Sequence, residues 1–179
     1  MRLLHTADWH LGRTLEGRSR LPEQEQMVDE LCTIANDAGV HLVIIAGDVF
    51  DSANPPALAE ELFYDALSRL SLGGRRGVVV IAGNHDNPDR LCAAAPLAAR
   101  QSVVLLGRPG ETALTANAKP GPVVATGPGW CEFAFDSGED GAVERVAVAT
   151  LPYPSETRLD EALVSEIKDE EATRNAYSE

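Results

Sequence analysis

The sequence predicts an α/β fold built on a parallel sheet, because apolar segments of strand length alternate with segments of helical periodicity. Two successive strand–helix–strand units fill residues 2–82, and such units place their strands parallel with right-handed crossovers. After about residue 100, short strand candidates are separated by Gly and Pro, which favours closer, antiparallel pairing. With 179 residues, the chain is long enough to form one domain with a substantial core.

The first unit begins with a predicted strand at residues 2–7. Residues 22–38 follow with apolar side chains at helical spacing, and Gly39 is expected to stop this helix. Residues 41–46 form a continuous apolar run, which is typical of a strand buried on both faces of a parallel sheet.

The second unit begins with Asn54 and Pro55, which are expected to be the N-cap and first residue of a helix. This helix should end at the Gly73–Gly74 pair and lead into a third buried strand at residues 77–82. An acidic helix is predicted from residue 155 onward. Between these parts lie the strand candidates at residues 103–106, 122–125, 130–135 and 143–150.

Composition limits the location of the protein and its cysteine chemistry. No apolar run approaches the ~18 residues that cross a bilayer, and the N-terminus becomes polar too soon for a signal peptide, so we expect a cytoplasmic protein. Cys32, Cys92 and Cys131 are odd in number and far apart, which excludes a disulfide framework and a cysteine zinc site. They are expected to be small buried side chains.

The chain is strongly acidic, with 28 Asp and Glu against 15 Lys and Arg and a formal net charge of −13. A protein that binds DNA with its own surface needs a basic face, whereas this charge repels phosphates at long range. Either the chain does not bind nucleic acid, or metal ions and a partner supply the positive charge.

Potential metal ligands cluster at the ends of the three predicted strands. Each cluster alone is common in ordinary turns, but three in order, each after a strand, favour one shared site. Gly47 and Gly83 are expected where a Cβ would crowd this site. The three segments are Asp8-Trp9-His10, Gly47-Asp48-Val49-Phe50-Asp51 and Gly83-Asn84-His85-Asp86.

These segments suit hydrolysis of a phosphate ester by two metal ions. In an extended chain, residues two apart point the same way, so Asp8 and His10 are expected to bind one ion. Asp48, after the middle strand, is the candidate to bridge both ions, and Asn84 would contribute its side-chain oxygen to the second. Oxygen and imidazole ligands together favour manganese, iron or zinc over calcium.

His85 has a different expected role. It follows a ligand but points the other way along an extended chain, so it can contact the phosphate or protonate the leaving oxygen. Asp51 is the candidate to orient and charge this histidine, as carboxylates often do.

The three segments resemble the first three motifs of the calcineurin-like metallophosphoesterases, Asp-x-His, Gly-Asp-x-x-Asp and Gly-Asn-His-Asp. This resemblance implies an α/β/β/α sandwich, in which central mixed sheets are flanked by helices. Residues 5–12, 83–91 and 151–153 further resemble the SbcD family, the nuclease subunits of bacterial SbcCD complexes. The match is close over residues 1–100 and looser up to residue 155.

The resemblance implies that Asp8, His10, Asp48 and Asn84 are metal ligands and that His85 is the catalytic histidine. It implies a manganese-dependent enzyme that degrades double-stranded DNA ends, cuts single strands and opens hairpins in repair and recombination. It also implies a homodimer of nuclease subunits and an ATPase partner of the SbcC type, which would hold the DNA and supply the positive charge.

Three arginines, Arg13, Arg18 and Arg20, follow the first motif closely enough to contact a substrate phosphate. Arg13 lies nearest to the motif and is the first candidate. An ordinary surface position is an equal alternative for all three.

One departure from the family pattern affects the expected activity. Family members have further histidines, in Gly-His and Gly-His-x-His motifs, that complete both metal shells. This sequence has only four, His5, His10, His41 and His85, and the first and third of these are expected to be structural. Residues 1–179 are therefore interpreted as the N-terminal portion of one nuclease domain, without distal motifs or a capping domain, and with little or no activity alone.

Two other functions remain open. The motifs also fit a phosphoesterase that acts on nucleotides, phosphoproteins or small esters, although the residues that flank the first and third motifs favour the DNA nuclease. The chain could instead be a non-catalytic binding module, although all four ligand candidates are present.

Overall fold

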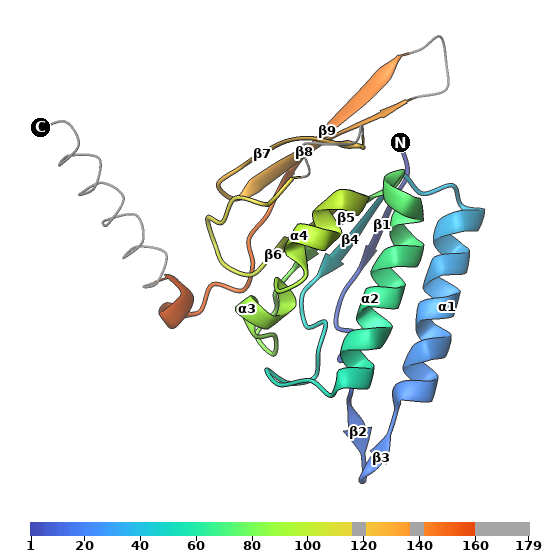
Figure 1. Ribbon diagram of the computed structural model, residues 1–179, viewed down its shortest axis with the longest axis vertical. Coiled ribbons are helices and arrows are strands. Elements are labelled where there is room, and N and C mark those ends of the chain that lie inside the picture. Colours follow the sequence, from blue (N-terminus) through green and yellow to red (C-terminus); the bar gives the residue numbers. More distant parts are fainter. Residues whose placement is uncertain (116–120, 137–141, 160–179) are drawn as a thin grey trace, which may run out of the picture.

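The computed structural model describes residues 1–115, 121–136 and 142–159. Its centre is a parallel sheet of four strands in the order β1-β4-β5-β6, with two long helices over one face (Figure 1). The predicted strand–helix–strand units are confirmed. Their elements are β1 (Leu3–Thr6), α1 (Leu21–Asp37), β4 (Leu42–Ala46), α2 (Ala57–Ser71), β5 (Gly77–Ile81) and β6 (Val103–Leu106).

A second, antiparallel sheet lies against the other face of the first (Figure 1). Cys131, Phe133 and Phe135 of this sheet pack with Leu42 and Val79 of the parallel sheet in one buried cluster. Helices, parallel sheet and antiparallel sheet are therefore successive layers, in agreement with the predicted fold class. The strands of the second sheet are β7 (Val123–Gly127), β8 (Trp130–Asp136) and β9 (Val143–Ala149).

The prediction of antiparallel pairing is confirmed for β7, β8 and β9 but is wrong for β6, which pairs in parallel with β5. Two single-turn helices, α3 (Pro88–Leu91) and α4 (Ala95–Ala98), carry the chain back across the sheet to start β6. Helices of one turn contain too few residues to show a periodic pattern in the sequence. The sequence pattern therefore did not indicate this crossover.

The start of the second helix also differs from the prediction. Asn54 and Pro55 precede the helix, whose first residue is Ala57 and whose N-cap is Pro56 in an extended conformation. A proline disfavours helical geometry in the residue before it, so Pro56 keeps Pro55 out of the helix.

All three cysteines are free thiols. Cys32 and Cys131 are buried and Cys92 is half-buried, as expected of small core side chains. Burial raises the pKa of Cys92 to about 12 and the pKa of Cys131 to about 11, so both thiols stay protonated at neutral pH.

The last described segment, residues 142–159, contains β9 and ends in helical residues 156–159. The remainder of the predicted acidic helix lies outside the described residues. Within the described ranges, no helix combines the length and apolar character needed to cross a membrane.

Candidate metal centre

The carboxyl ends of β1, β4 and β5 lie side by side, and the three motifs form the loops that follow them. Ligand atoms of Asp8, His10 and Asp48 lie within 4.8 Å of one another. Three of the four predicted metal ligands are thus brought together. Asn84 is exposed in the third loop, one residue before His85, whose backbone N–H donates to Asp48 Oδ1 at 3.0 Å.

All three clustered residues adopt left-handed backbone conformations, with φ of 57° at Asp8, 45° at His10 and 48° at Asp48. The expectation that Asp8 and His10 point the same way along an extended chain is therefore wrong. Non-glycine residues adopt this conformation at a cost, which Asp and His tolerate better than most. Backbone hydrogen bonds hold the first loop in place, from Asp8 N–H to Gly47 O at 3.1 Å and from His10 N–H to Asp48 O at 3.0 Å.

The second and third loops approach each other closely at two glycines. A Cβ on Gly47, which has φ of 92°, would lie 3.0 Å from Gly83 Cα. A Cβ on Gly83 would lie 2.1 Å from Asp48 Oδ1. The prediction that a Cβ would crowd the site at both positions is confirmed, and Gly83 leaves the space that the Asp48 carboxylate occupies.

Asp86, the last residue of the third motif, ties the second and third loops together. The residue is 2% exposed, and its carboxylate accepts hydrogen bonds from the backbone N–H groups of Gly83 at 2.8 Å, Val49 at 3.2 Å and Phe50 at 2.9 Å. Three such donors stabilise a buried carboxylate without a cation. The motif contained Asp86, but no local pattern in the sequence identified this role.

Gln24 of α1 supports the first loop. Its Nε2 donates to His10 O at 2.7 Å, and its Oε1 accepts from Gly12 N–H at 3.0 Å. Gln24 is not part of any of the three sequence motifs. The only signal was a polar side chain at a position that shares the buried face of the helix with Val28 and Cys32.

The Asp51 carboxylate lies beside His10, not beside His85 as predicted. A parallel bridge between Leu11 and Phe50 places the first loop next to Asp51, and Asp51 Oδ1 lies 3.4 Å from His10 Nδ1. This contact is not aligned for a hydrogen bond. The buried Nδ1 of His10 therefore has no hydrogen-bond partner within the described part of the chain.

His85 contacts the main chain of Asp51 instead, with Nδ1 2.9 Å from the Asp51 carbonyl oxygen. A carbonyl oxygen only accepts hydrogen bonds, so Nδ1 carries the hydrogen and Nε2 is left for other partners. His85 is exposed, and its ring packs edge-on against the ring of His10 with centroids 4.9 Å apart. Asp51 thus orients the ring through its backbone.

The clustered side chains fit a divalent cation. No Lys or Arg among residues 1–115, 121–136 and 142–159 forms an ion pair with Asp8 or Asp48, and Asp48 is only 8% exposed. Two neighbouring carboxylates repel each other, and a divalent cation bound between them would relieve this repulsion. The unpartnered nitrogen of His10 offers a further ligand, and such mixed donors suit a transition metal.

Of the three candidate arginines, Arg13 lies beside Asp51, with Nε 4.0 Å from Asp51 Oδ1 and a side chain that is 53% exposed. Arg18 lies in the hairpin of β2 (Thr14–Leu15) and β3 (Arg18–Ser19). Arg20 pairs with Glu23 of α1. Arg13 therefore remains the candidate that could contact a substrate phosphate.

Two substitutions of Asp8 measure the strain at the site. Glycine accepts φ of 57° without steric cost, whereas alanine carries the Cβ penalty. We expect Asp8→Gly to have a higher free energy of unfolding than Asp8→Ala, by about 1 kcal/mol in urea denaturation. The same pair at Glu30, exposed on α1, should show the usual preference for alanine. Equal stability of the two Asp8 variants would show that no strain is present.

Comparison with known proteins gives a family match. The sequence model described as calcineurin-like phosphoesterase matches residues 1–137, which contain all three motifs and the parallel sheet. The D subunit of the nuclease SbcCD from Bacillus subtilis (strain 168) is 50% identical over 177 residues, which cover 99% of this chain and 40% of that protein.

Two further relatives carry the same name. The protein from Rhodobacter capsulatus is 41% identical over 108 residues, covering 60% of this chain and 27% of its own length. The protein from Escherichia coli (strain K12) is 42% identical over 87 residues, covering 49% of this chain and 22% of its own. The matched regions thus span 40% or less of these relatives. The family match and the geometry at the strand ends agree, and the chain belongs to the calcineurin-like phosphoesterases.

Proposed function

We propose that this chain carries the metal-binding part of a DNA nuclease of the SbcD type, which hydrolyses phosphodiester bonds at DNA ends and hairpins in repair and recombination. The observation that carries the proposal is the cluster of Asp8, His10 and Asp48, with ligand atoms within 4.8 Å, at the end of a phosphoesterase sheet. Relatives that are named as the D subunit of the nuclease SbcCD support the choice of substrate.

Asp48 is the proposed bridging ligand between two metal sites. Its carboxylate lies beside Asp8 and His10, and it also accepts the N–H of His85, next to the proposed ligand Asn84. Divalent ions held by these residues, manganese in our proposal, would stabilise charge on the phosphate oxygens and supply an acidified water. The protein holds the ligands in fixed positions. The Asp48 carboxylate has little room to move, because it lies against Gly83 and because backbone hydrogen bonds join its loop to the first loop.

His85 is the proposed proton donor to the leaving oxygen. The Asp51 carbonyl oxygen, 2.9 Å from Nδ1, fixes the ring and leaves Nε2 to hold the transferred proton. Exposure of His85 lets a nucleic-acid strand reach this nitrogen, whereas Asp48 beneath it is shielded. Arg13 is the proposed contact to a neighbouring phosphate.

The net charge of −13 makes a partner part of this proposal. An acidic surface does not hold DNA, so the basic contacts are assigned to an ATPase of the SbcC type. The names of the relatives, which are subunits of SbcCD, support this assignment. A DNA substrate would also place the activity in the cytoplasm.

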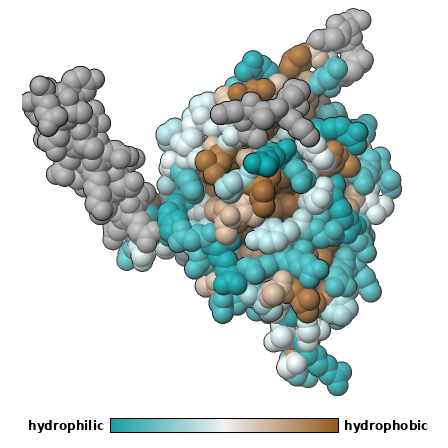
Figure 2. Space-filling view, in the orientation of Figure 1, coloured by the Kyte–Doolittle hydropathy of each residue, from teal (hydrophilic) through white to brown (hydrophobic). Residues whose placement is uncertain are grey.

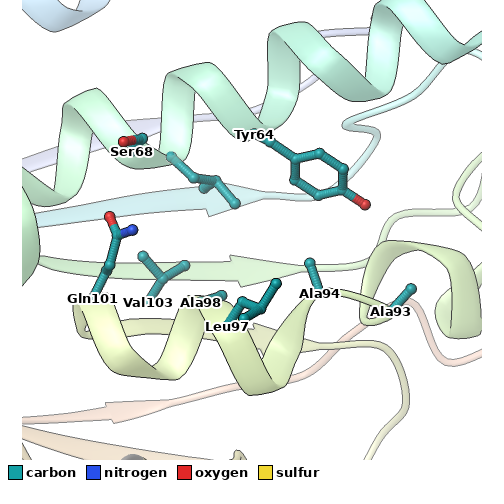
Figure 3. A pocket seen from close by; sticks show the side chains of 9 residues that line it. Tyr64, Ser68, Ala93, Ala94, Leu97, Ala98, Gln101 and Val103 are labelled. Carbon is teal, nitrogen blue, oxygen red and sulfur yellow. The ribbon is translucent and has the colours of Figure 1, made fainter.

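A groove of about 470 Å³ between α2 and α4 is the proposed contact between two copies of the chain. Leu97 is 67% exposed and Tyr64 is 37% exposed, on opposite sides of the groove (Figure 3). Figure 2 shows hydrophobic residues gathered near the middle of the same face, with hydrophilic residues around them. The residues that line the groove carry no charge, so two acidic chains can approach there with the least repulsion.

Titration of manganese into the purified chain tests the metal site. We expect measurable binding, and at least about tenfold weaker binding for Asp48→Asn, because the amide removes the bridging charge. Asp89→Asn is the matched control, since Asp89 is 78% exposed and pairs with Arg108 away from the cluster. Should loss of the Asp48 carboxylate disturb folding, Asp8→Gly removes a ligand without backbone strain. Unchanged affinity in both site variants would contradict the proposal.

A chimera tests the substrate. The 177 matched residues of this chain would replace the matching part of the Bacillus subtilis relative, which supplies the portion this chain does not match. We expect the chimera to degrade linear duplex DNA with manganese, and the His85→Gln chimera to lose this activity. The 179 residues alone should show little or no cleavage, because the sequence has no histidine after His85 to complete the second metal shell. Hydrolysis of a small aryl phosphodiester with duplex DNA left intact would support the alternative phosphoesterase.

Light scattering tests the dimer. We expect the wild-type chain to have the mass of two copies, and Leu97→Asp to have the mass of one, because a charge in the apolar groove repels its partner. Leu58→Asp is the control and should remain dimeric, because Leu58 lies on α2 outside the groove and is 63% exposed. The same mass for the wild type and Leu97→Asp would exclude this surface.

A further inference from the structure

We infer that Arg158 is a positioning residue for the loop that presents Asn84 and His85. This inference rests on the proposed function of that loop. Arg158 follows the second sheet, 75 residues after Gly83 in the chain, yet its guanidinium reaches the loop directly. Nη1 donates to Gly83 O at 3.0 Å, and Nη2 donates to Asp86 O at 2.6 Å.

The two carbonyl groups bracket the two functional residues. Gly83 precedes Asn84 and Asp86 follows His85, so one planar guanidinium fixes both ends of the segment between them. Arginine suits this task because its donors are held in a rigid fork, whereas a lysine ammonium is a single point on a flexible stem. Arg158 therefore bridges the two ends of the loop on their carbonyl side.

Arg158 is itself held in place by its own segment. Nη1 also donates to Tyr153 O at 3.3 Å, and the guanidinium lies 5.7 Å from the centre of the Tyr153 ring. The backbone N–H of Tyr153 donates to Ala82 O at 2.9 Å, just before the loop begins. The segment from Tyr153 to Arg158 thus binds three carbonyl groups of the stretch from Ala82 to Asp86.

Other residues hold the N–H groups of the same loop. Gly83 N–H donates to the Asp86 carboxylate and His85 N–H donates to Asp48 Oδ1. The loop is therefore fixed on its N–H side by carboxylates and on its carbonyl side by Arg158. Without the Arg158 side chain, only the N–H contacts would hold residues 83–86, and the carbonyl groups of Gly83 and Asp86 would lose the guanidinium as their donor.

The location of Arg158 separates positioning from general stability. Arg158 is half-buried, and its guanidinium contacts the loop and Tyr153 above the strand ends. Loss of its side chain should therefore open the loop and leave the strands below it intact. A local effect of this kind is what distinguishes a positioning residue from a residue that stabilises the whole fold.

The test compares Arg158→Gln and Arg158→Lys with Arg145→Gln in the complete 179-residue chain. Arg145 is an exposed arginine of β9 that pairs with Glu132, so it controls for the loss of one ion-pairing cation. In Arg158→Gln, we expect amide hydrogen exchange at Gly83 and His85 to be roughly tenfold faster, since two hydrogen bonds are lost. Exchange within residues 42–46 should be unchanged. The manganese affinity of Arg158→Gln should fall by about tenfold, as for other contacts that orient metal ligands. Arg158→Lys should restore only part of the exchange protection and part of the manganese affinity.

Each outcome decides the inference. Unchanged exchange at Gly83 and His85 in Arg158→Gln would overturn it, and so would faster exchange spread evenly over the parallel sheet, which would indicate a general structural role. Faster exchange confined to the loop, with weaker manganese binding, would support it. If the wild-type chain binds no manganese while the local exchange still rises, the proposed metal site fails and the positioning of the loop by Arg158 stands.

Discussion

The site depends on the close approach of the backbones that leave β1, β4 and β5. The register pairs Thr6 with Ile45 and Ile45 with Val80, so the three parallel strands end level with one another. Hydrogen bonds between the first two loops continue the pairing past the strand ends. Gly47 and Gly83 remove the Cβ atoms that would hold the second and third loops apart. Ligands from distant parts of the sequence meet because the sheet brings their main chains into contact first.

This arrangement has a cost in backbone conformation. The three clustered residues adopt left-handed geometry, and each such residue costs on the order of 1–3 kcal/mol. The buried sheet offsets this cost, because core residues of its strands such as Val43 and Val78 are fully buried and hold the loop ends in register. A ligand set anchored to rigid strands keeps its geometry without bound ions, whereas the same residues on a free loop would relax.

The sequence revealed features that local patterns encode. Strand and helix positions follow from runs and periodicity, and the three motifs could be assigned to strand ends because each stands directly after its strand. Asp51 contacts His85 through its carbonyl oxygen and not through the carboxylate that was predicted to do so, since the left-handed turn and the bridge at Leu11 cannot be read from residue types. Gln24 acts on main-chain groups 12 and 14 residues away and Arg158 on loop carbonyl groups 75 and 72 residues away, so no spacing in the sequence indicates them.

Electrostatics connects the metal site to the proposed partner. Carboxylates in low-dielectric surroundings attract divalent cations strongly, and a chain with a net charge of −13 concentrates such cations around itself. The same field opposes the approach of a phosphate backbone, and two bound ions would cancel only part of it. Under the proposed function, the metal site would therefore load with ions before DNA arrives, and DNA would be delivered by a basic surface elsewhere in the assembly. Without such a partner, a site of this charge would favour small or weakly charged phosphate esters over DNA. This is the alternative phosphoesterase function, which the test of duplex DNA against a small aryl phosphodiester distinguishes from a nuclease.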